Sequence, residues 1–201
     1  MGCGSGRVTR RLAGLGARVT GIEPNAQAVA AAQAKGDGPV YVAVSATATG
    51  LPDASFDIVL FSHSLHHIPD MPAALTEAHR LTRPGGRVTV MEPEAPDPIW
   101  PVARWIEDES AVYAEAQTAL EDMVQSGWFC RETTLRYASK YHVETADELI
   151  ADMLAVDPAR TVSAEDRQRV AVAFATAEQS DERGRYLTCW ERIDVLRLPA
   201  G

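Results

Sequence analysis

Short apolar runs alternate with helical patterns over the first 93 residues of the chain. Apolar runs rich in β-branched residues predict strands at 17–23, 39–44, 56–62 and 87–92. Apolar residues spaced three or four positions apart predict helices at 7–15, 25–35 and 71–82. The run 56–62 is almost continuously apolar, which is typical of a strand buried on both faces. Strands that alternate with helices indicate β-α units that build a parallel sheet.

The pattern changes after Pro93, where three further prolines follow within a few residues. A long helical pattern then predicts a helix at 102–126, whereas the aromatic-rich stretch 127–143 permits no assignment. Further helices are predicted at 145–155, with Thr145 as the cap, and at 164–178. Apolar and polar residues alternate over 184–198, which predicts a final antiparallel strand.

We therefore predict an α/β fold of the Rossmann-like, doubly wound type, with a mostly parallel sheet and an antiparallel C-terminal strand. Residues 1–93 form its ligand-binding core in this interpretation, and residues 94–143 form a helical and aromatic insertion that covers the substrate. Residues 144–201 supply the C-terminal helices and the last strand of the same domain.

Composition narrows the kind of partner that the chain can have. The chain has 201 residues, which suits one domain, and its net charge of −9 with no basic cluster disfavours nucleic acid. No apolar run is long enough to span a membrane. Three widely separated cysteines indicate a reducing compartment, so we expect a cytoplasmic protein. We expect a small-molecule substrate, and a homo-oligomer is left open.

The sequence Gly2-Cys3-Gly4-Ser5-Gly6 comes immediately before a predicted helix. Glycines at this spacing allow a tight turn and a close approach of backbone N–H groups to a ligand, and the following helix N-terminus favours electronegative groups. A flexible tail is the plain alternative for this motif alone. Glu23 ends the next strand, where an acid of a doubly wound sheet can accept both hydroxyl hydrogens of a ribose. The alternative for Glu23 is a surface carboxylate that caps the helix at Asn25.

Several motifs occur in one order and spacing: Gly-Cys-Gly-Ser-Gly, Gly-Ile-Glu-Pro-Asn, Leu-Pro-Asp-Ala-Ser-Phe-Asp-Ile-Val, Leu-His-His-Ile-Pro-Asp and Leu-Thr-Arg-Pro-Gly-Gly-Arg-Val. Together they resemble the class I S-adenosylmethionine-dependent methyltransferases that act on small molecules. The resemblance is close over residues 1–93 and loose beyond them. It implies S-adenosyl-L-methionine as the cofactor, and we expect no metal because the histidines have no ligand partner at helical spacing.

The resemblance also implies a cofactor-binding set, which comprises Gly2, Cys3, Gly4, Gly6, Glu23, Pro24, Ser45, Ala46, Ser62 and His63. Glu23 would hold the ribose hydroxyls, and Pro24 with the next residue would lie on the adenine ring. Ser45 stands where the family usually has an aspartate for the adenine amine, so recognition would rest more on the backbone of Ala46. Ser62 and His63 would lie beside the transferring methyl group.

His63 is the candidate catalytic base, because histidine titrates near neutrality and an acceptor that carries a proton must lose it. The alternative is a residue that only shapes the pocket. His66 and His67 are expected to make structural hydrogen bonds. The aromatic residues after the strand 87–92 either cover a hydrophobic acceptor or form ordinary core, and the sequence leaves both interpretations open: Trp100, Trp105, Tyr113, Trp128 and Phe129.

In the family that this chain resembles, the glycine loop follows a central strand that lies between those matching 17–23 and 56–62. Met1 stands where that strand would be ending, so the resemblance implies that this first strand is missing and the chain is truncated inside the glycine motif. Each buried backbone group left unpaired would cost roughly 1–3 kcal/mol. We expect a miscalled start; a gap filled by another segment or subunit, and an inactive remnant, are the alternatives.

The leading functional hypothesis is a methyltransferase that transfers the methyl group of S-adenosylmethionine to oxygen, nitrogen or carbon of a small molecule. The alternative is a non-catalytic or degenerate S-adenosylmethionine-binding module, which the shortened front and Ser45 favour.

Overall fold

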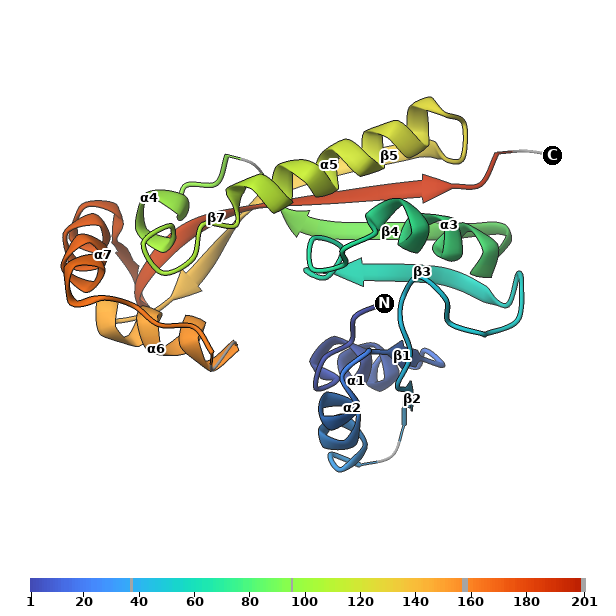
Figure 1. Ribbon diagram of the computed structural model, residues 1–201, viewed down its shortest axis with the longest axis horizontal. Helices are drawn as coiled ribbons and strands as arrows, with labels where there is room; N and C mark the ends of the chain where they lie inside the picture. Colours follow the sequence, from blue (N-terminus) through green and yellow to red (C-terminus); the bar gives the residue numbers. More distant parts are fainter. Residues whose placement is uncertain (37, 95, 157–158, 200–201) are drawn as a thin grey trace. The chain divides into compact units, whose positions relative to one another are not determined.

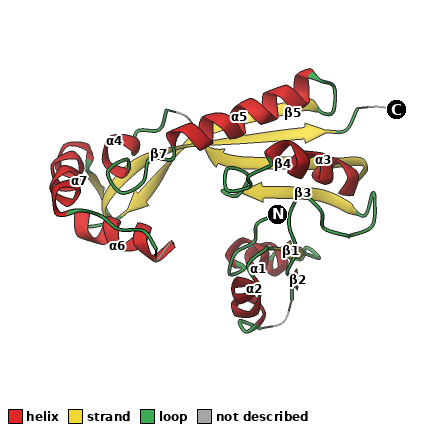
Figure 2. Ribbon diagram, viewed as in Figure 1, coloured by secondary structure: helices red, strands yellow, loops and turns green. Residues whose placement is uncertain are grey.

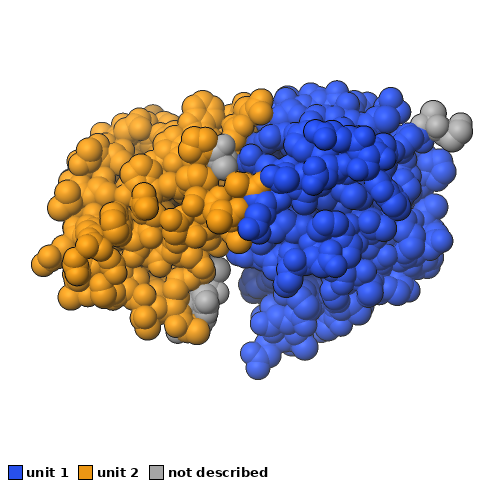
Figure 3. Space-filling view, turned by 45° about the horizontal axis from the view of Figure 1, so that its top comes forward, with its two compact units in different colours: residues 1–92, 115–135, 192–201 blue, residues 93–114, 136–191 orange. Residues whose placement is uncertain are grey.

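The computed structural model describes residues 1–36, 38–94, 96–156 and 159–199. These residues form two compact units, which Figure 3 shows in different colours. Unit 1 comprises residues 1–92, 115–135 and 192–201, and unit 2 comprises residues 93–114 and 136–191. Each unit is described by itself below.

The first β-α elements of unit 1 follow the sequence pattern closely (Figure 1). Helix α1 spans Arg7–Gly14, strand β1 spans Thr20–Ile22, helix α2 spans Ala26–Gln33 and strand β2 spans Val40–Val42. Strands β1 and β2 pair in parallel, with Gly21 opposite Tyr41. They form a two-stranded sheet of their own.

The larger sheet orders its main strands as β3, β4, β7 and β5, and β6 pairs with β7 (Figure 2). Strand β3 spans Phe56–Ser62, helix α3 spans Met71–Leu81 and strand β4 spans Thr82–Pro93. Strands β3 and β4 are parallel, whereas Figure 1 draws β4 and β7 with their arrows in opposite directions. The predicted α/β class with a mixed sheet is confirmed.

The tight turn predicted at residues 83–86 lies inside β4, where it interrupts the pairing of β4 with β3. Phe56 pairs with Thr82, but Ile58 pairs with Arg87, so one residue of β3, Asp57, stands opposite the four residues 83–86 of β4. Gly85 takes a left-handed φ of 80°, and a Cβ on Gly86 would lie 2.7 Å from the Asp57 carbonyl oxygen. The two glycines therefore let the extra residues leave the ladder and return beside β3.

Strands β1 and β3 belong to different sheets, and the first residues of the chain bond to both of them. The backbone nitrogen of Met1 donates to the Leu60 carbonyl oxygen at 2.8 Å, and Cys3 N–H donates to the Ile22 carbonyl oxygen at 2.9 Å. Residues 1–3 thus link the end of β1 with the end of β3 and place the glycine loop between them.

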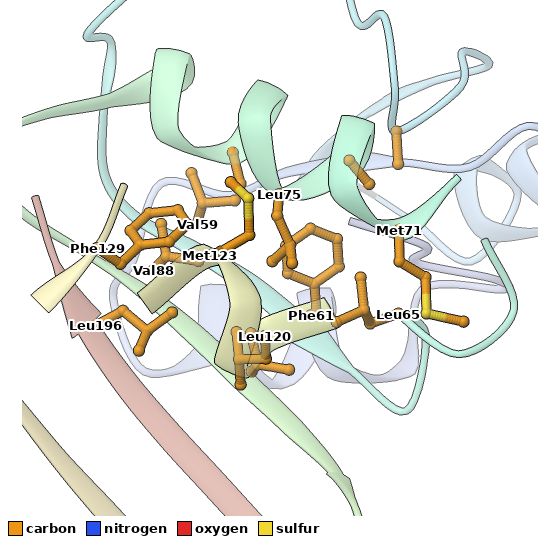
Figure 4. Packing of buried hydrophobic residues seen from close by; sticks show 14 of the residues in the cluster. Val59, Phe61, Leu65, Met71, Leu75, Val88, Leu120, Met123, Phe129 and Leu196 are labelled. Atoms are coloured by element: carbon orange, nitrogen blue, oxygen red, sulfur yellow. The ribbon is translucent and has the colours of Figure 1, made fainter. Parts of the chain in front are cut away.

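The core of unit 1 lies between α3, α5 and the sheet (Figure 4). Helix α5 spans Ser110–Gln125, and its Leu120 and Met123 contribute to this core. Phe61 and Leu75 are fully buried in it. Burial of side chains of this size contributes roughly 1.5–3 kcal/mol each, so the core fixes β3 and the loop that follows it.

Unit 2 has its own hydrophobic core, to which Val102, Leu149, Phe174 and Leu187 contribute. Its elements include helix α4 at Trp100–Ala103, helix α6 at Ala146–Val156, helix α7 at Ala164–Ala177 and strand β6 at Gln179–Asp181. Strands β5, Cys130–His142, and β7, Gly184–Arg197, contribute residues to both units.

Three sequence predictions differ from this structure. The helix predicted at 102–126 is broken between α4 and α5, because the Asp108 side chain accepts from the Ser110 N–H and begins a new helix. The unassigned stretch 127–143 contains β5, and β6 was not expected. The cap at Thr145 is confirmed by its hydroxyl accepting from Glu148 N–H.

The predicted boundaries at 93 and 143 also differ from the two compact units. Residues 115–135 and 192–201 join unit 1, because α5 and the end of β7 complete its core. The aromatic residues divide accordingly, since Phe129 is buried in the core of unit 1 while Trp105 packs against the core of unit 2. Among the described residues, no helix combines the length and apolar character needed to cross a membrane.

Candidate functional site

The glycine loop has a left-handed backbone at every second residue. Gly2, Gly4 and Gly6 have φ angles of 64°, 48° and 79°. A Cβ on Gly2 would lie 2.7 Å from the Ser64 Cβ, and one on Gly6 would lie 2.4 Å from the Tyr41 hydroxyl oxygen. The backbone conformation favours glycine at all three positions, and the space requires it at Gly2 and Gly6. The loop leads directly into α1.

Glu23 follows β1 and binds the glycine loop through its carboxylate. Its Oε2 accepts from Gly4 N–H at 3.0 Å, and its Oε1 accepts from Asn25 N–H at 3.1 Å. Each carboxylate oxygen has a second lone pair, which can accept from a hydroxyl group. The carboxylate therefore combines features of both sequence interpretations: it lies at the glycine loop, and it contacts the start of α2. The cap of α2 itself is the Asn25 side chain, which accepts from Gln27 and Ala28 N–H.

Cys3 anchors the glycine loop to β1. Besides the bond from Cys3 N–H to Ile22, the thiol lies so near β1 that a Cβ on Gly21 would be 2.9 Å from Sγ. Burial raises the pKa of the Cys3 thiol, and the nearby Glu23 charge adds to the shift. Cys3 is therefore a protonated packing residue of the loop at neutral pH.

Ser45 and Ala46 follow β2 and differ in exposure. Ser45 is exposed and its hydroxyl lies 2.9 Å from that of Thr47, while its Oγ also accepts from Thr47 N–H at 3.2 Å. Ala46 is buried in the core of unit 1. Pro24 is exposed beside Glu23. The contacts of these residues with an adenine ring remain a prediction.

Ser62 and His63 stand at the end of β3, where the chain turns sharply. His63 has a left-handed φ of 49°, which is uncommon for a residue with a side chain, and its N–H donates to the Met91 carbonyl oxygen at 2.8 Å. The His63 side chain is exposed. A residue in this conformation persists only where the surrounding structure holds it, and such residues concentrate at functional sites.

A buried acid that the sequence analysis did not single out holds the loop after β3. Glu92, at the end of β4, accepts from the backbone N–H groups of Ser64 and Leu65 at 3.0 and 2.7 Å. Its other oxygen contacts Nδ1 of His66, which is the kind of structural bond expected for His66. The signal available in the sequence was an acid at the carboxyl end of a buried strand, the same position that Glu23 has after β1.

These residues lie at the carboxyl ends of strands that pair in parallel, β1 with β2 and β3 with β4. In open α/β sheets, this edge is where ligands bind, and the glycine loop with Glu23 has the form of a nucleoside site. The residues present fit S-adenosylmethionine: the space where a Cβ on Gly4 would stand is open, and the Glu23 carboxylate bonded to Gly4 keeps lone pairs that can accept from a ligand. The fold and this edge therefore define a nucleoside-cofactor-binding α/β protein.

Comparison with known proteins narrows the class. Residues 1–90 match the family model described as a methyltransferase domain. An uncharacterised methyltransferase of Mycobacterium tuberculosis is 32% identical over 111 residues, which are 53% of this chain and 56% of the relative. A ubiquinone biosynthesis O-methyltransferase of Rhizobium leguminosarum is 35% identical over 94 residues, which are 45% of this chain and 37% of that protein. The matched region thus spans little more than half of the Mycobacterium tuberculosis protein and less than half of the Rhizobium leguminosarum protein.

The fold extends the similarity over the rest of the chain. The crystal structure of a proposed methyltransferase from Bacillus halodurans aligns with a TM-score of 0.72 at 17% identity, covering 99% of this chain and 90% of that one. Residues 1–90 therefore resemble a methyltransferase domain in sequence, and the described chain resembles a solved structure of that kind in fold.

Proposed function

We propose that the protein transfers the methyl group of S-adenosylmethionine to a small organic molecule. The observation that supports the proposal is the bond between Glu23 and Gly4, because it holds a carboxylate, the group that would accept from a ribose, against the glycine loop. Bound S-adenosylmethionine would supply a sulfonium-activated methyl group, so the protein needs mainly to orient the acceptor.

The acceptor class rests on charge and on the relatives. The net charge of −9 disfavours binding to the phosphates of nucleic acid. The Rhizobium leguminosarum relative is described as an O-methyltransferase of ubiquinone biosynthesis, which is a small-molecule pathway. A small-molecule acceptor in the cytoplasm is accordingly part of the proposal.

In the proposed site, Glu23 accepts from the two ribose hydroxyls while it keeps its bonds to the backbone. The peptide edge of the glycine loop lies beside the methionine portion, and Pro24 lies against the adenine ring. Ser62 and His63 border the methyl group. The acceptor's lone pair would form the new bond to the methyl carbon as the carbon–sulfur bond of the sulfonium breaks and S-adenosylhomocysteine leaves. His63 Nε2 or Nδ1 would take the proton of a hydroxyl or amine acceptor and pass it to solvent from the exposed ring.

Calorimetric titration with S-adenosylhomocysteine is the first test, because the product of the reaction binds without needing an acceptor. Saturable one-to-one binding is expected, and Glu23→Ala should weaken it by about tenfold or more because the ribose loses its acceptor. A folded protein that does not bind S-adenosylhomocysteine would overturn the proposal. Glu94→Ala is the matched control, because it removes an acid of unit 2 that is ion-paired with Arg136 and lies outside the proposed cofactor-binding set.

The role of His63 is tested by separating binding from turnover. His63→Ala should lower the rate of methyl transfer about 100-fold while the affinity for S-adenosylhomocysteine stays within about twofold. Acceptors are found by incubating cell extract with labelled S-adenosylmethionine and following the label by mass spectrometry. An unchanged rate in the variant would exclude the base role and leave His63 as part of the pocket wall.

The alternative function is that of a non-catalytic module that binds S-adenosylmethionine. Ser45 favours it, because a hydroxyl is a weaker acceptor for the adenine amine than a carboxylate. Tight binding of S-adenosylhomocysteine with no labelled product in extracts of the native host would support this alternative.

A further inference from the structure

Glu92 is a buried acid whose partners all lie on one loop. It is 5% exposed, and its Oε1 accepts from the consecutive N–H groups of Ser64 and Leu65. Its Oε2 contacts Nδ1 of His66, which is 6% exposed. A carboxylate is suited to this position, because its two oxygens offer about four lone pairs and it needs no donor of its own.

Ser64 connects that loop to the glycine loop. Its hydroxyl donates to the Met1 carbonyl oxygen at 2.9 Å and accepts from Ser62 N–H at 3.2 Å. Ser64 is also the residue that lies against Gly2, since a Cβ on Gly2 would be 2.7 Å from the Ser64 Cβ. Ser64 therefore makes both bonds: its N–H donates to Glu92, and its hydroxyl donates to Met1.

The bonds form a continuous path from β4 to the proposed cofactor site. Glu92 fixes the backbone at Ser64, and Ser64 fixes both the residue before His63 and Met1, the residue before the glycine loop. Removal of the carboxylate would leave two buried N–H groups without their acceptor, at a cost of roughly 1–3 kcal/mol each. The loop would relieve that cost by moving toward water, and the glycine loop would lose its support.

We propose that Glu92 is a positioning residue, which acts through Ser64 to hold the glycine loop and the turn at His63 in the geometry that binds cofactor. The proposal rests on the proposed function, because it assigns a purpose to the glycine loop. It goes beyond that function by placing a determinant of cofactor affinity on β4, on a residue that touches neither the cofactor nor the acceptor.

Glu77 provides a matched control within the same unit. It is likewise a buried acid, at 8% exposure, and its Oε1 accepts from the N–H of Thr49 and from the Thr49 hydroxyl at 2.9 and 2.6 Å. It belongs to α3 and fixes the segment before β3, which has no contact with the glycine loop among the described hydrogen bonds. Glu77→Gln therefore reports the general effect of altering a buried carboxylate.

The experiment combines hydrogen–deuterium exchange with calorimetry on four variants of the full chain. Glu92→Ala should speed exchange in residues 62–68 and also in residues 1–6, and weaken binding of S-adenosylhomocysteine by about tenfold. Glu92→Gln keeps a carbonyl oxygen for the two N–H groups, so it should rescue most of the affinity. Ser64→Ala should speed exchange in residues 1–6 while Leu65 and His66 stay protected. Glu77→Gln should leave both segments and the affinity unchanged.

The outcomes separate this proposal from the proposed function. If the unaltered protein does not bind S-adenosylhomocysteine, the proposed function fails, whereas the exchange pattern still tests the path from Glu92 to the glycine loop. If the unaltered protein binds, but Ser64→Ala and Glu92→Ala show the same affinity and the same exchange in residues 1–6 as the unaltered protein, the positioning role is wrong. Should Glu92→Ala fail to fold, the test is whether Ser64→Ala exchanges faster than Glu77→Gln in residues 1–6; equal exchange in the two variants would overturn the positioning role.

Discussion

His63 shows how single residues of the site are held against their own preference. Its left-handed φ of 49° costs free energy for any residue with a Cβ, and Ala54 has the same conformation with φ of 48°. The two differ in context: His63 ends β3 at the proposed site, whereas Ala54 lies in the segment before β3 and donates to the Arg80 carbonyl oxygen.

Replacement of these residues by glycine should separate strain from function. His63→Gly and Ala54→Gly should each raise the free energy of unfolding by about 1 kcal/mol, because glycine adopts a left-handed φ without the Cβ penalty. Urea denaturation measures this change. Only His63→Gly should lower methyl transfer; equal loss of transfer in Ala54→Gly would show that the effect is not local.

Ser45 allows a direct test of adenine recognition. Ser45→Asp should raise the affinity for S-adenosylhomocysteine about fivefold, since a charged acceptor strengthens the bond from the adenine amine. Calorimetry with the inosine analogue, which lacks that amine, is the control and should show no gain. A gain for both ligands would assign the effect to general electrostatics, and no gain for either would remove Ser45 from the adenine site.

At the scale of elements, the ends of strands and helices decide how the site is presented. Helix α2 begins at a cap formed by Asn25, two residues after Glu23, so the cap fixes where the chain turns away from the site. Helix α7 in unit 2 begins at Ser163 in the same way, with its side chain accepting from Asp166 N–H.

Loss of the α2 cap should affect both stability and binding. Asn25→Ala should lower the free energy of unfolding by about 1 kcal/mol, because two N–H groups of the first turn lose their acceptor. It should also weaken binding of S-adenosylhomocysteine, whereas Ser163→Ala should cost similar stability and leave binding intact. Thermal unfolding and calorimetry of the two variants give the comparison. If Asn25→Ala binds S-adenosylhomocysteine as tightly as Ser163→Ala does, the start of α2 does not position Glu23.

At the scale of the whole molecule, the two units carry buried acids with opposite responses to pH. In unit 1, bonds from Arg80 and Thr49 lower the pKa of Glu77 to about 2. In unit 2, burial raises the pKa of Asp97 to about 6, although Ile99 and Trp190 N–H donate to it. A lowered pKa means that the folded state binds fewer protons than the unfolded chain, and a raised pKa means that it binds more.

Acidification should therefore stabilise unit 2 before it destabilises unit 1. Between pH 6 and about 4, the folded state keeps a proton on Asp97 that the unfolded chain loses, so the contribution of Asp97 to stability grows as the pH falls. The contribution of Glu77 is complete above about pH 4.5 and is lost as the pH falls toward 2. Hydrogen exchange by segment measures the two units separately. Asp97→Asn should abolish the first dependence and Glu77→Gln the second; persistence of either in its variant would assign it to other groups.

The sequence by itself determined the elements of residues 1–93, the glycine loop and Glu23. These follow from local rules, since apolar periodicity, glycine spacing and the order of strands are written in neighbouring residues. The same local rules missed the break at Asp108 and the strand β5, because a cap overrides helix periodicity and β5 is half-exposed and rich in polar residues.

Only the tertiary structure decided the role of Glu92 and the grouping of the chain into two units. Glu92 and Ser64 are 28 positions apart in the sequence, and the carboxylate meets its three partners only because β3 and β4 pair in parallel and end at the same edge. Residues 115–135 and 192–201 join unit 1 for the same reason, since a core is formed by side chains that are close in space and far apart in the chain.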